Sequence, residues 1–487
     1  MSEMLLEPAI AQANAVAQGE VSAVELLQMS FGRVDALNPA LNAVIWQDRA
    51  AAMAQAKACD QERAEGQLRG PLHGVPITVK ESFDLAGSPT TWGIPEWANN
   101  IRPEDSDAVK RYRAAGGVIY GKTNVPLKLA DWQSFNKIYG STSNPWDPTR
   151  TPGGSSGGAA VAIATGMSAL EVGSDIGSSI RNPAHYCGIF GLKPTWNAVS
   201  MQGHLPAGWF GDIDIGVGGP LARTAADLTL AMDILAGPSR FEGSQYKLSL
   251  PSDSRERLAD FKVALMLGDD ASPVDAEYLA ALSGFADKLE AAGATVVRNK
   301  LPDIDSEAHF SLYLNLLGAA MSFGMTDVDV AAMWSIYDGA GADVLRVGKN
   351  RMAGIETNHR DWLAADNDRR IARLKFDAFF EDFDVILAPV CAGPAFLKDE
   401  EGPRQLRYIE VNGAPQLEVL QLFWSGYSGV VGLPSVVGPM DQVRGLPVGY
   451  QAITGHGRDY TALAFARAVE AEIVGFTPPP LVRQAPK

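Results

Sequence analysis

Apolar residues recur at helical intervals over the first part of the chain. Ser22-Ala23-Val24-Glu25 has the spacing of a capping box, in which a serine and a glutamate three residues later satisfy free backbone donors of a first helical turn. The sequence therefore predicts a helix that begins there. Asn38-Pro39 is expected to end it, because proline interrupts a helix. A second helix, rich in alanine and charged residues, is expected over 48–66.

The next segment changes period. Over 74–80, three valine or isoleucine residues alternate with Thr78 and Lys80. This alternation is typical of a strand, whose successive side chains point to opposite faces. Lys80 is thus expected to point away from the three apolar side chains.

The same two periods predict the remaining elements. Helices are expected over 105–115, 159–165, after 179, over 276–292 and 460–472, and through 305–375. Strands are expected over 118–120, 169–172, 261–267, 294–297 and 383–389. Loops are expected over 140–158 and, between two subregions, over 238–260. Strands that alternate with helices throughout indicate an α/β protein.

Composition limits the classes of function. The 487 residues are 46% hydrophobic and 20% charged, so the chain can bury a large core and is not disordered. The length allows three domains, although large α/β enzymes of this size occur as one. With 41 Lys and Arg against 57 Asp and Glu, the formal net charge is −16. Nucleic acids and anionic membranes require a basic surface, so a small or uncharged partner is expected instead.

Three further features bear on the compartment. Cys59, Cys187 and Cys391 are odd in number and far apart, so neither a disulfide framework nor a pair of zinc ligands is expected. Residues 1–12 contain two glutamates and no lysine or arginine, the wrong charge for a signal peptide. The uncharged run 419–440 has the length of a membrane span, but its four glycines and two prolines predict strands and turns in a core. A soluble cytoplasmic protein is expected.

A first motif lies at 116–123. The sequence GGVIYGKT matches the GxxxxGK[ST] pattern of a phosphate-binding loop. Such a loop needs a strand before its first glycine and a flexible interior, whereas here a helix precedes and the strand-like residues 118–120 fill the interior. The match is expected to be coincidental, and nucleotide binding is kept as an alternative function.

A second motif, GGSSG at 153–157, fits the GxSxG pattern of a nucleophile elbow. An elbow joins a strand to a helix, but a loop rich in proline, asparagine and aspartate precedes this motif. An α/β-hydrolase is therefore a weaker alternative. Its catalytic histidine would come from His185, His204, His309, His359 or His456.

A third motif, GSDIGSSIR at 173–181, has the strand–turn–helix context that exposes a nucleophile. Small residues at 177 and 178 let the backbone approach a substrate closely. The consecutive N–H groups of Ile176 to Ser179 can converge on one oxygen, as an oxyanion hole requires. Taken alone, a tight turn with a capping serine explains the same pattern.

The combination of Lys80, Ser155 and Ser179 favours chemistry. A serine at its ordinary pKa needs an adjacent base, and the six histidines are scattered without a motif. A lysine can be that base if burial lowers its pKa toward neutrality. The strand over 74–80 offers Lys80 a route into the interior, although most lysines are solvated.

These residues resemble the pattern of the amidase signature family. The likeness rests on GGSSGG at 153–158 and on GSDIGSSIRNPAHYCGIFGLKPT at 173–195. It continues through 74–80, 90–93, 121–124, 219–224, the strand ending at Pro389, 432–434 and 445–449. It covers nearly the whole chain apart from about 240–375, and it accounts for the two competing motifs as parts of one pattern.

The resemblance implies a fold and a domain organisation. The expected fold is a single large α/β/α sandwich with a central mixed β-sheet flanked by helices. Residues 1–487 would form one amidase domain, with 70–230 as the signature core and about 240–375 as a variable region that shapes the substrate site.

By position, the resemblance implies three catalytic roles. Ser179 corresponds to the acyl-accepting nucleophile, Ser155 to a bridging serine associated with a cis peptide bond, and Lys80 to the general base. Neutral Lys80 would take a proton from Ser155, which would take one from Ser179. Neither a metal nor a cofactor is implied.

The backbone N–H groups of Ile176, Gly177 and Ser178, with Ser179 as a further candidate, would form the oxyanion hole. The family usually has glycine where this chain has Ser178. Because this residue contributes mainly an N–H group, the hole is expected to survive, with the hydroxyl narrowing the pocket or adding a donor.

Residues around the nucleophile have supporting roles in this interpretation. Asp175 and Arg181 are expected to fix the turn by hydrogen bonds, and a surface ion pair is the alternative. Ser156 is expected to orient the Gly/Ser loop rather than react. Cys187 is expected to be a buried thiol. His185 is expected to pack in the core, with a place in the site as its alternative.

The resemblance implies a hydrolase of C–N bonds other than peptide bonds, acting on a small amide or carbamate, with esters and anilides as further substrates. Bulky residues suggest an apolar or aromatic substrate, although each is equally suited to the core: Leu127, Leu129, Trp132, Phe135, Trp146 and Trp209. One alternative is the amide-hydrolysing component of a tRNA-dependent amidotransferase, whose pattern 125–136 does not match. Another is a binding protein with an inactive site. A monomer or homodimer is expected.

Overall fold

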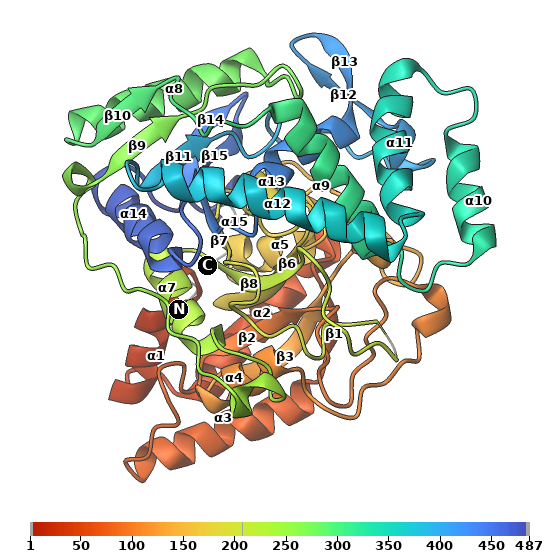
Figure 1. Ribbon diagram of the computed structural model, residues 1–487. Coiled ribbons are helices and arrows are strands. Elements are labelled where there is room, and N and C mark those ends of the chain that lie inside the picture. Colours follow the sequence, from red (N-terminus) through yellow and green to blue (C-terminus); the bar gives the residue numbers. More distant parts are fainter. Residues whose placement is uncertain (1–2, 207, 484–487) are drawn as a thin grey trace.

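The computed structural model describes residues 3–206 and 208–483. Eight strands form a mixed central sheet in the order β10-β9-β11-β15-β14-β7-β8-β6 (Figure 1). β10, β9 and β11 are parallel, and each later neighbour in this order is antiparallel to the one before it. The strands are β6 Leu170–Asp175, β7 Phe190–Lys193, β8 Val217–Ala222, β9 Lys262–Leu265, β10 Thr295–Arg298, β11 Val385–Ala388, β14 Ser435–Val443 and β15 Leu446–Ile453.

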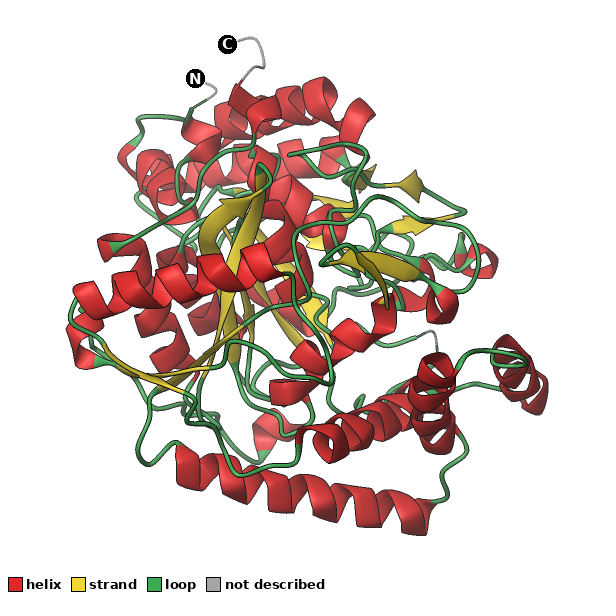
Figure 2. Cartoon of the chain, turned by 90° about the horizontal axis from the view of Figure 1, so that it is seen from above, coloured by secondary structure: helices red, strands yellow, loops and turns green. Residues whose placement is uncertain are grey.

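Helices flank this sheet on both sides, as the view from above shows (Figure 2). The α-helices are α1 Ala9–Gln18, α2 Ala23–Leu41, α3 Arg49–Ala64, α4 Asp107–Ala114, α5 Gly157–Thr165, α6 Arg181–Cys187, α7 Ala225–Leu235, α8 Ala276–Ala291, α9 Ser306–Met321, α10 Asp327–Ile336, α11 Ala342–Ile355, α12 His359–Phe379, α13 Leu422–Gly429, α14 Asp459–Glu472 and α15 Pro480–Arg483. The predicted α/β sandwich with a central mixed sheet is confirmed.

A second, smaller sheet carries the candidate base. It has the order β1-β3-β2, where β1 is Val44–Gln47, β2 is Pro76–Lys80 and β3 is Val118–Thr123. β2 is parallel to β3 and lies beside β6 of the central sheet, because the Thr78 hydroxyl donates to the Glu171 carboxylate at 2.5 Å. Thr78 and Lys80 thus share the face of β2 that meets β6, as the alternation over 74–80 predicts. Two further two-stranded ladders are β4 Phe135–Asn136 with β5 Gly140–Ser141, and β12 Tyr408–Val411 with β13 Ala414–Leu417.

α5 sits between these sheets and is buried on every side. Its small residues make this possible, since a Cβ atom on Gly158 would lie 2.3 Å from the Asn124 backbone nitrogen. A helix enclosed by protein on all sides has no polar face. α5 therefore fixes the Gly/Ser loop before it deep in the molecule.

The predicted end of the first long helix is wrong by one turn. The capping box begins α2 as expected, with the Glu25 N–H donating to the Ser22 hydroxyl at 3.1 Å. The helix nevertheless continues through Pro39 to Leu41. The proline lies in the last turn, where it removes only one hydrogen bond. The Asn38 carboxamide then accepts from the Ala43 and Val44 N–H groups at 2.8 and 2.9 Å and fixes the exit.

The interpretation of 419–440 as strands and turns is also partly wrong. Its first half forms a 3-10 turn, Glu418–Gln421, and α13, whereas its second half enters β14 as predicted. All eight residues of α13 are buried, so no polar face marks a helical period. None of the helices in the described part of the chain is long and apolar enough to cross a membrane.

Other expectations are confirmed. Residues 261–298 form the parallel unit β9-α8-β10, and 305–375 form the helices α9 to α12. The interior of the GGVIYGKT motif is β3, and the Lys122 ammonium is buried, where it donates to the Thr90 hydroxyl at 3.0 Å. Residues 116–123 are thus a strand and not a phosphate-binding loop.

Candidate active site

Lys80 ends β2 in complete isolation from solvent, with 0% exposure. Its ammonium nitrogen lies 2.7 Å from the Ser155 hydroxyl oxygen and 2.9 Å from that of Ser174 on β6. Burial lowers the pKa of Lys80 to about 7, although the carboxylate of Asp175 opposes this shift. A lysine of this kind is largely neutral slightly above pH 7 and can accept a proton.

Ser155 lies in the Gly/Ser loop that precedes α5. Its peptide bond to Gly154 is cis. The next residue, Ser156, donates its N–H to the Ser179 carbonyl at 3.1 Å and its hydroxyl to the Ser174 carbonyl at 3.4 Å. Ser156 therefore ties the Gly/Ser loop to the turn that carries Ser179, in agreement with an orienting role.

Asp175 and Arg181 form a fully buried ion pair that encloses this turn. Arg181 donates to both Asp175 oxygens, at 2.9 and 3.0 Å, and Asp175 also accepts the N–H groups of Ser178 and Ile180 at 2.9 and 3.1 Å. Burial alone would raise the pKa of Asp175, but the Arg181 guanidinium outweighs it and holds that pKa below its ordinary value. The alternative of a surface ion pair is excluded by this burial.

The carbonyl groups of the turn 176–179 are all held by protein donors. The Tyr313 hydroxyl donates to the Ile176 carbonyl at 3.0 Å, and the Trp132 indole N–H donates to the Gly177 carbonyl at 2.7 Å. The carbonyls of Ser178 and Ser179 accept from the N–H groups of Asn182 and Ser156, at 2.7 and 3.1 Å. Because the C=O and N–H of a peptide unit point in opposite directions, these bonds also fix the directions of the N–H groups.

These N–H groups bear on the predicted oxyanion hole. Ser178 donates its N–H to Asp175 and has a φ of 72°, the left-handed region that favours glycine. Within residues 3–206 and 208–483, the N–H groups of Ile176, Gly177 and Ser179 donate to no protein acceptor. The geometry thus offers these three donors to a ligand, and the predicted contribution of Ser178 competes with its bond to Asp175.

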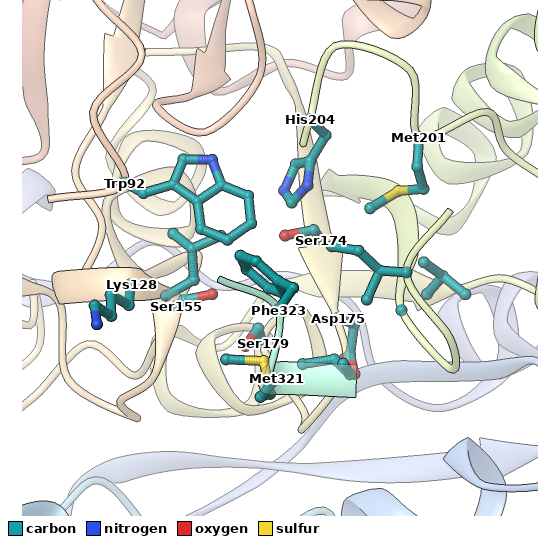
Figure 3. A pocket seen from close by; sticks show the side chains of 15 residues that line it. Trp92, Lys128, Ser155, Ser174, Asp175, Ser179, Met201, His204, Met321 and Phe323 are labelled. Atoms are coloured by element: carbon teal, nitrogen blue, oxygen red, sulfur yellow. The ribbon is translucent and has the colours of Figure 1, made fainter. Parts of the chain in front are cut away.

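Ser155, Ser174 and Ser179 line one pocket (Figure 3). No hydrogen bond joins the Ser155 and Ser179 hydroxyls in the described part of the chain, so the second step of the predicted relay remains a prediction. The remaining wall is mostly apolar. Its apolar members are Trp92, Leu129, Ile176, Met201, Ile213, Val217, Met321 and Phe323.

His204 and Lys128 complete the pocket wall. His204 is buried, and one ring nitrogen lies 2.9 Å from the Ser82 hydroxyl. Burial and the nearby Lys80 lower the pKa of His204 well below its ordinary value, so this ring is neutral. Lys128 directs its ammonium away from the middle of the pocket (Figure 3).

Most of the predicted bulky walls lie elsewhere. Only Leu129 of the six lines this pocket. Trp132 lies beneath the turn, and the Trp146 indole donates to the Cys187 carbonyl at 3.0 Å. Leu127 and Trp209 are 49% and 44% exposed. Proximity to the motifs along the chain misled here, because wall residues come from segments that only the fold brings together.

The residues missed by sequence reasoning differ in how they could have been found. Ser174 belongs to the third motif and could have been included. Trp92 follows β2 closely, and its N–H donates to the buried Glu81 carboxylate at 3.0 Å. Met321 and Phe323 lie at and just beyond the end of α9, in a region without any motif, and no sequence signal indicates them.

The remaining predictions near the site are structural. Cys187 is a buried thiol as expected. His185 is fully buried and accepts the Gly449 N–H at 2.8 Å, so it packs in the core. Burial lowers the pKa of His185 to about 4.

One group of potential metal ligands is present, formed by Cys59, Glu62 and His73. Two of the three are already bound to neighbours. One ring nitrogen of His73 contacts the Cys59 carbonyl at 3.0 Å and the other accepts the Arg69 N–H at 3.1 Å. Glu62 binds the Arg69 guanidinium. These residues do not line the pocket that contains Ser179.

Comparison with known proteins gives consistent relatives. A family model described as Amidase matches residues 25–463. Indoleacetamide hydrolase from Bradyrhizobium diazoefficiens is 34% identical over 481 residues, which span 95% of this chain and 86% of that protein. The A-type component of glutamyl-tRNA(Gln) amidotransferase from Methylobacillus flagellatus is 31% identical, over 91% of this chain and 96% of that protein.

A solved structure supports the same fold. A bacterial aryl acylamidase of the amidase signature family superposes with a TM-score of 0.81, covering 99% of each chain at 22% identity. At this identity the likeness extends to the fold alone.

Proposed function

The chain belongs to the amidase signature family, whose members are hydrolases of amide C–N bonds, and we propose that it hydrolyses a small amide with an apolar or aromatic acyl group. The observation that carries this function is the 2.7 Å hydrogen bond between Lys80 and Ser155, made where water is excluded and beside Ser179 in one pocket. A neutral lysine in contact with a serine hydroxyl is what a serine nucleophile without a histidine requires.

In the proposed acylation, the Ser179 hydroxyl oxygen attacks the amide carbonyl carbon and forms a C–O bond. Its proton moves to the Ser155 oxygen as the Ser155 proton moves to the Lys80 nitrogen. The negative charge on the carbonyl oxygen is stabilised by the N–H groups of Ile176, Gly177 and Ser179, which have no other acceptor among the described residues.

The tetrahedral intermediate then collapses. The C–N bond breaks as Ser155 gives a proton to the leaving nitrogen and recovers one from Lys80. Water attacks the resulting ester by the same relay, which releases the acid and restores Ser179. These steps are a proposal that derives from the residues present and balances every proton.

An apolar acyl group fits the pocket wall, since burial of aromatic and aliphatic surface favours binding. The relative named indoleacetamide hydrolase agrees with a bicyclic aromatic acyl group. A carbamate or ester would present the same carbonyl to Ser179 and is included as a further substrate. Whether the enzyme is a monomer or a homodimer stays a prediction.

The alternative is the glutamine-hydrolysing component of an amidotransferase, which the second relative suggests. Glutamine carries an ammonium and a carboxylate group that need partners when buried. Of the charged side chains in the described pocket wall, Asp175 is paired with Arg181, and Lys128 directs its ammonium away. The wall thus favours an uncharged acyl group.

A hydrolysis screen tests the proposed function. Purified protein is incubated with phenylacetamide, indole-3-acetamide, an anilide, an ester, a carbamate and glutamine, and ammonia or acid release is measured, with Ser179→Ala as the control. We expect the aromatic primary amides to give the highest kcat/KM. Faster turnover of glutamine would favour the amidotransferase alternative, and no turnover of any compound would refute the proposal.

A further inference from the structure

The pocket that contains Ser179 adjoins a second cavity nearer the surface, here called the outer hollow. The outer hollow is lined by Trp209, Asp212 and Trp362, among others. Phe323 and Ile213 line both spaces and are the side chains that they share. A boundary made of two side chains separates the reacting groups from the outer hollow.

The Phe323 ring lies between two tryptophans of different environment. On the inner side it meets Trp92, which is 3% exposed, at a ring distance of 6.2 Å with the planes at 89°. On the outer side it meets Trp209, which is 44% exposed, at 5.7 Å. Both distances are within the range of favourable aromatic contacts. Phe323 therefore stands on the route from the surface to Ser179 (Figure 3).

The position of this ring is fixed by α9, which ends two residues before it. α9 packs closely against α11, because a Cβ atom on Gly318 would lie 2.1 Å from the Arg351 carbonyl oxygen and one on Gly354 would lie 1.8 Å from that of Asn315. Such a contact leaves no space for the helices to shift.

The same helix also holds the turn that carries the nucleophile, through the bond of Tyr313 to the Ile176 carbonyl. The turn 322–325 follows α9 and is closed by the Met325 N–H donating to the Ser322 carbonyl at 3.0 Å. The distance between the Phe323 backbone and the nucleophile turn is therefore set by one rigid element.

We infer that Phe323 determines specificity by limiting substrate length: its ring closes the inner pocket, so that amides with one compact aromatic group are accepted and amides with a second ring in line are excluded. This inference rests on the proposed function and names the substrate class of that site. Removing the ring joins the pocket to the outer hollow, whose Trp209 and Trp362 offer apolar surface for a second ring.

Two series of amides test the inference. One lengthens the acyl side, from phenylacetamide to biphenyl-4-acetamide, and the other lengthens the amine side, from N-phenylacetamide to N-(biphenyl-4-yl)acetamide. The enzymes are the wild type, Phe323→Ala, Phe323→Leu, which retains much of the bulk, and Phe210→Ala. Phe210 is 74% exposed and lines neither space, so it is the matched control.

We expect Phe323→Ala to raise the ratio of kcat/KM for the long amide to that for the short amide by about tenfold or more in at least one series, the scale at which pocket size discriminates between substrates. Phe323→Leu should raise it less, and Phe210→Ala should leave it unchanged. An unchanged ratio in both series overturns the inference, as does an equal loss for short and long amides.

Binding separates this inference from the proposed reaction. The dissociation constants of the same amides are measured by calorimetry on Ser179→Ala and on Ser179→Ala/Phe323→Ala. If the wild type hydrolyses no amide but loss of the ring selectively tightens binding of the long amides, the proposed function fails and the inference stands. If no amide binds to either protein, both are overturned.

Discussion

The ammonium nitrogen of Lys80 and the hydroxyl oxygen of Ser155 lie 2.7 Å apart, and neither side chain is more than 1% exposed. The contact joins the small sheet, through β2, to the loop that precedes α5. Its chemical meaning depends on whether the amine is protonated, which makes pH the most direct probe of the site.

The rate should depend on the neutral form of Lys80. Because the pKa of Lys80 is lowered to about 7, the amine is protonated below that pH and unable to accept a proton. We expect kcat/KM to fall about tenfold per pH unit below 7 and to level off above it. Lys80→Met should lose about 10²–10⁴-fold in rate and lack the inflection.

A second buried lysine provides the control for this profile. Burial also lowers the pKa of Lys193 to about 7, but its ammonium donates to the Leu433 carbonyl at 2.7 Å and does not line the pocket. Lys193→Met should keep the inflection near pH 7. Loss of the inflection in this variant, and its retention in Lys80→Met, would assign the titration to the wrong lysine.

The two neighbouring serines should differ sharply in their effect on turnover. Ser179→Ala removes the proposed nucleophile and should lower kcat by about 10⁴-fold or more. The Ser178 hydroxyl has no hydrogen-bond partner in the described part of the chain, so Ser178→Ala should retain activity within a few-fold. Mass spectrometry after reaction with a serine-directed phosphonate should locate the adduct at Ser179. An adduct on Ser155 or Ser174 would reassign the nucleophile.

The Asp175–Arg181 pair should be important for stability. Asp175→Ala leaves a guanidinium with 0% exposure without its carboxylate, and a broken buried pair typically costs about 3–5 kcal/mol of unfolding free energy. Urea denaturation measures this loss. Asp35→Ala, which breaks an ion pair that is 60% and 41% exposed, should change the urea midpoint little. Equal midpoints for the two variants would argue against a structural role for Asp175.

Tyr313 should act on the reaction by positioning the backbone. Tyr313→Phe removes the donor to the Ile176 carbonyl and frees the peptide unit that carries the Gly177 N–H. We expect kcat to fall about tenfold with little change in KM, since the oxyanion forms only during the reaction. Tyr278→Phe is a matched control, because its buried hydroxyl donates to the Gly449 carbonyl at 2.7 Å away from the pocket. Similar kcat values for the two variants would remove Tyr313 from the mechanism.

Much of the fold follows from local patterns in the chain. The capping box of α2, the alternation in β2 and the βαβ unit around α8 were each predictable, because a helix or strand with one buried face repeats its apolar residues at a fixed period. α13 was not, since burial on all sides removes the period. Nor does the sequence indicate that Lys80 belongs to a sheet separate from the central one.

The site divides in the same way. Lys80, Ser155 and Ser179 were found because their motifs are short and specific, and the structure places the first two in contact and both serines at one pocket. The walls were mostly missed, because Met201, Met321 and Phe323 reach the pocket through tertiary contacts without a local signature. Tyr313 lies 137 residues from the carbonyl that it holds.

The dry environment of Lys80 has a thermodynamic consequence beyond the reaction. The side chain binds its proton with a pKa of about 7 in the native protein, against an ordinary value of 10.5. Between these values the denatured chain takes up more protons at this residue than the native one, so its contribution penalises folding fully below pH 7 and disappears progressively up to pH 10.5. Lys80→Met should consequently melt at a higher temperature than the wild type in mildly acidic buffer, with the difference shrinking as the buffer becomes alkaline, which would mark this amine as a group retained for chemistry at the expense of robustness.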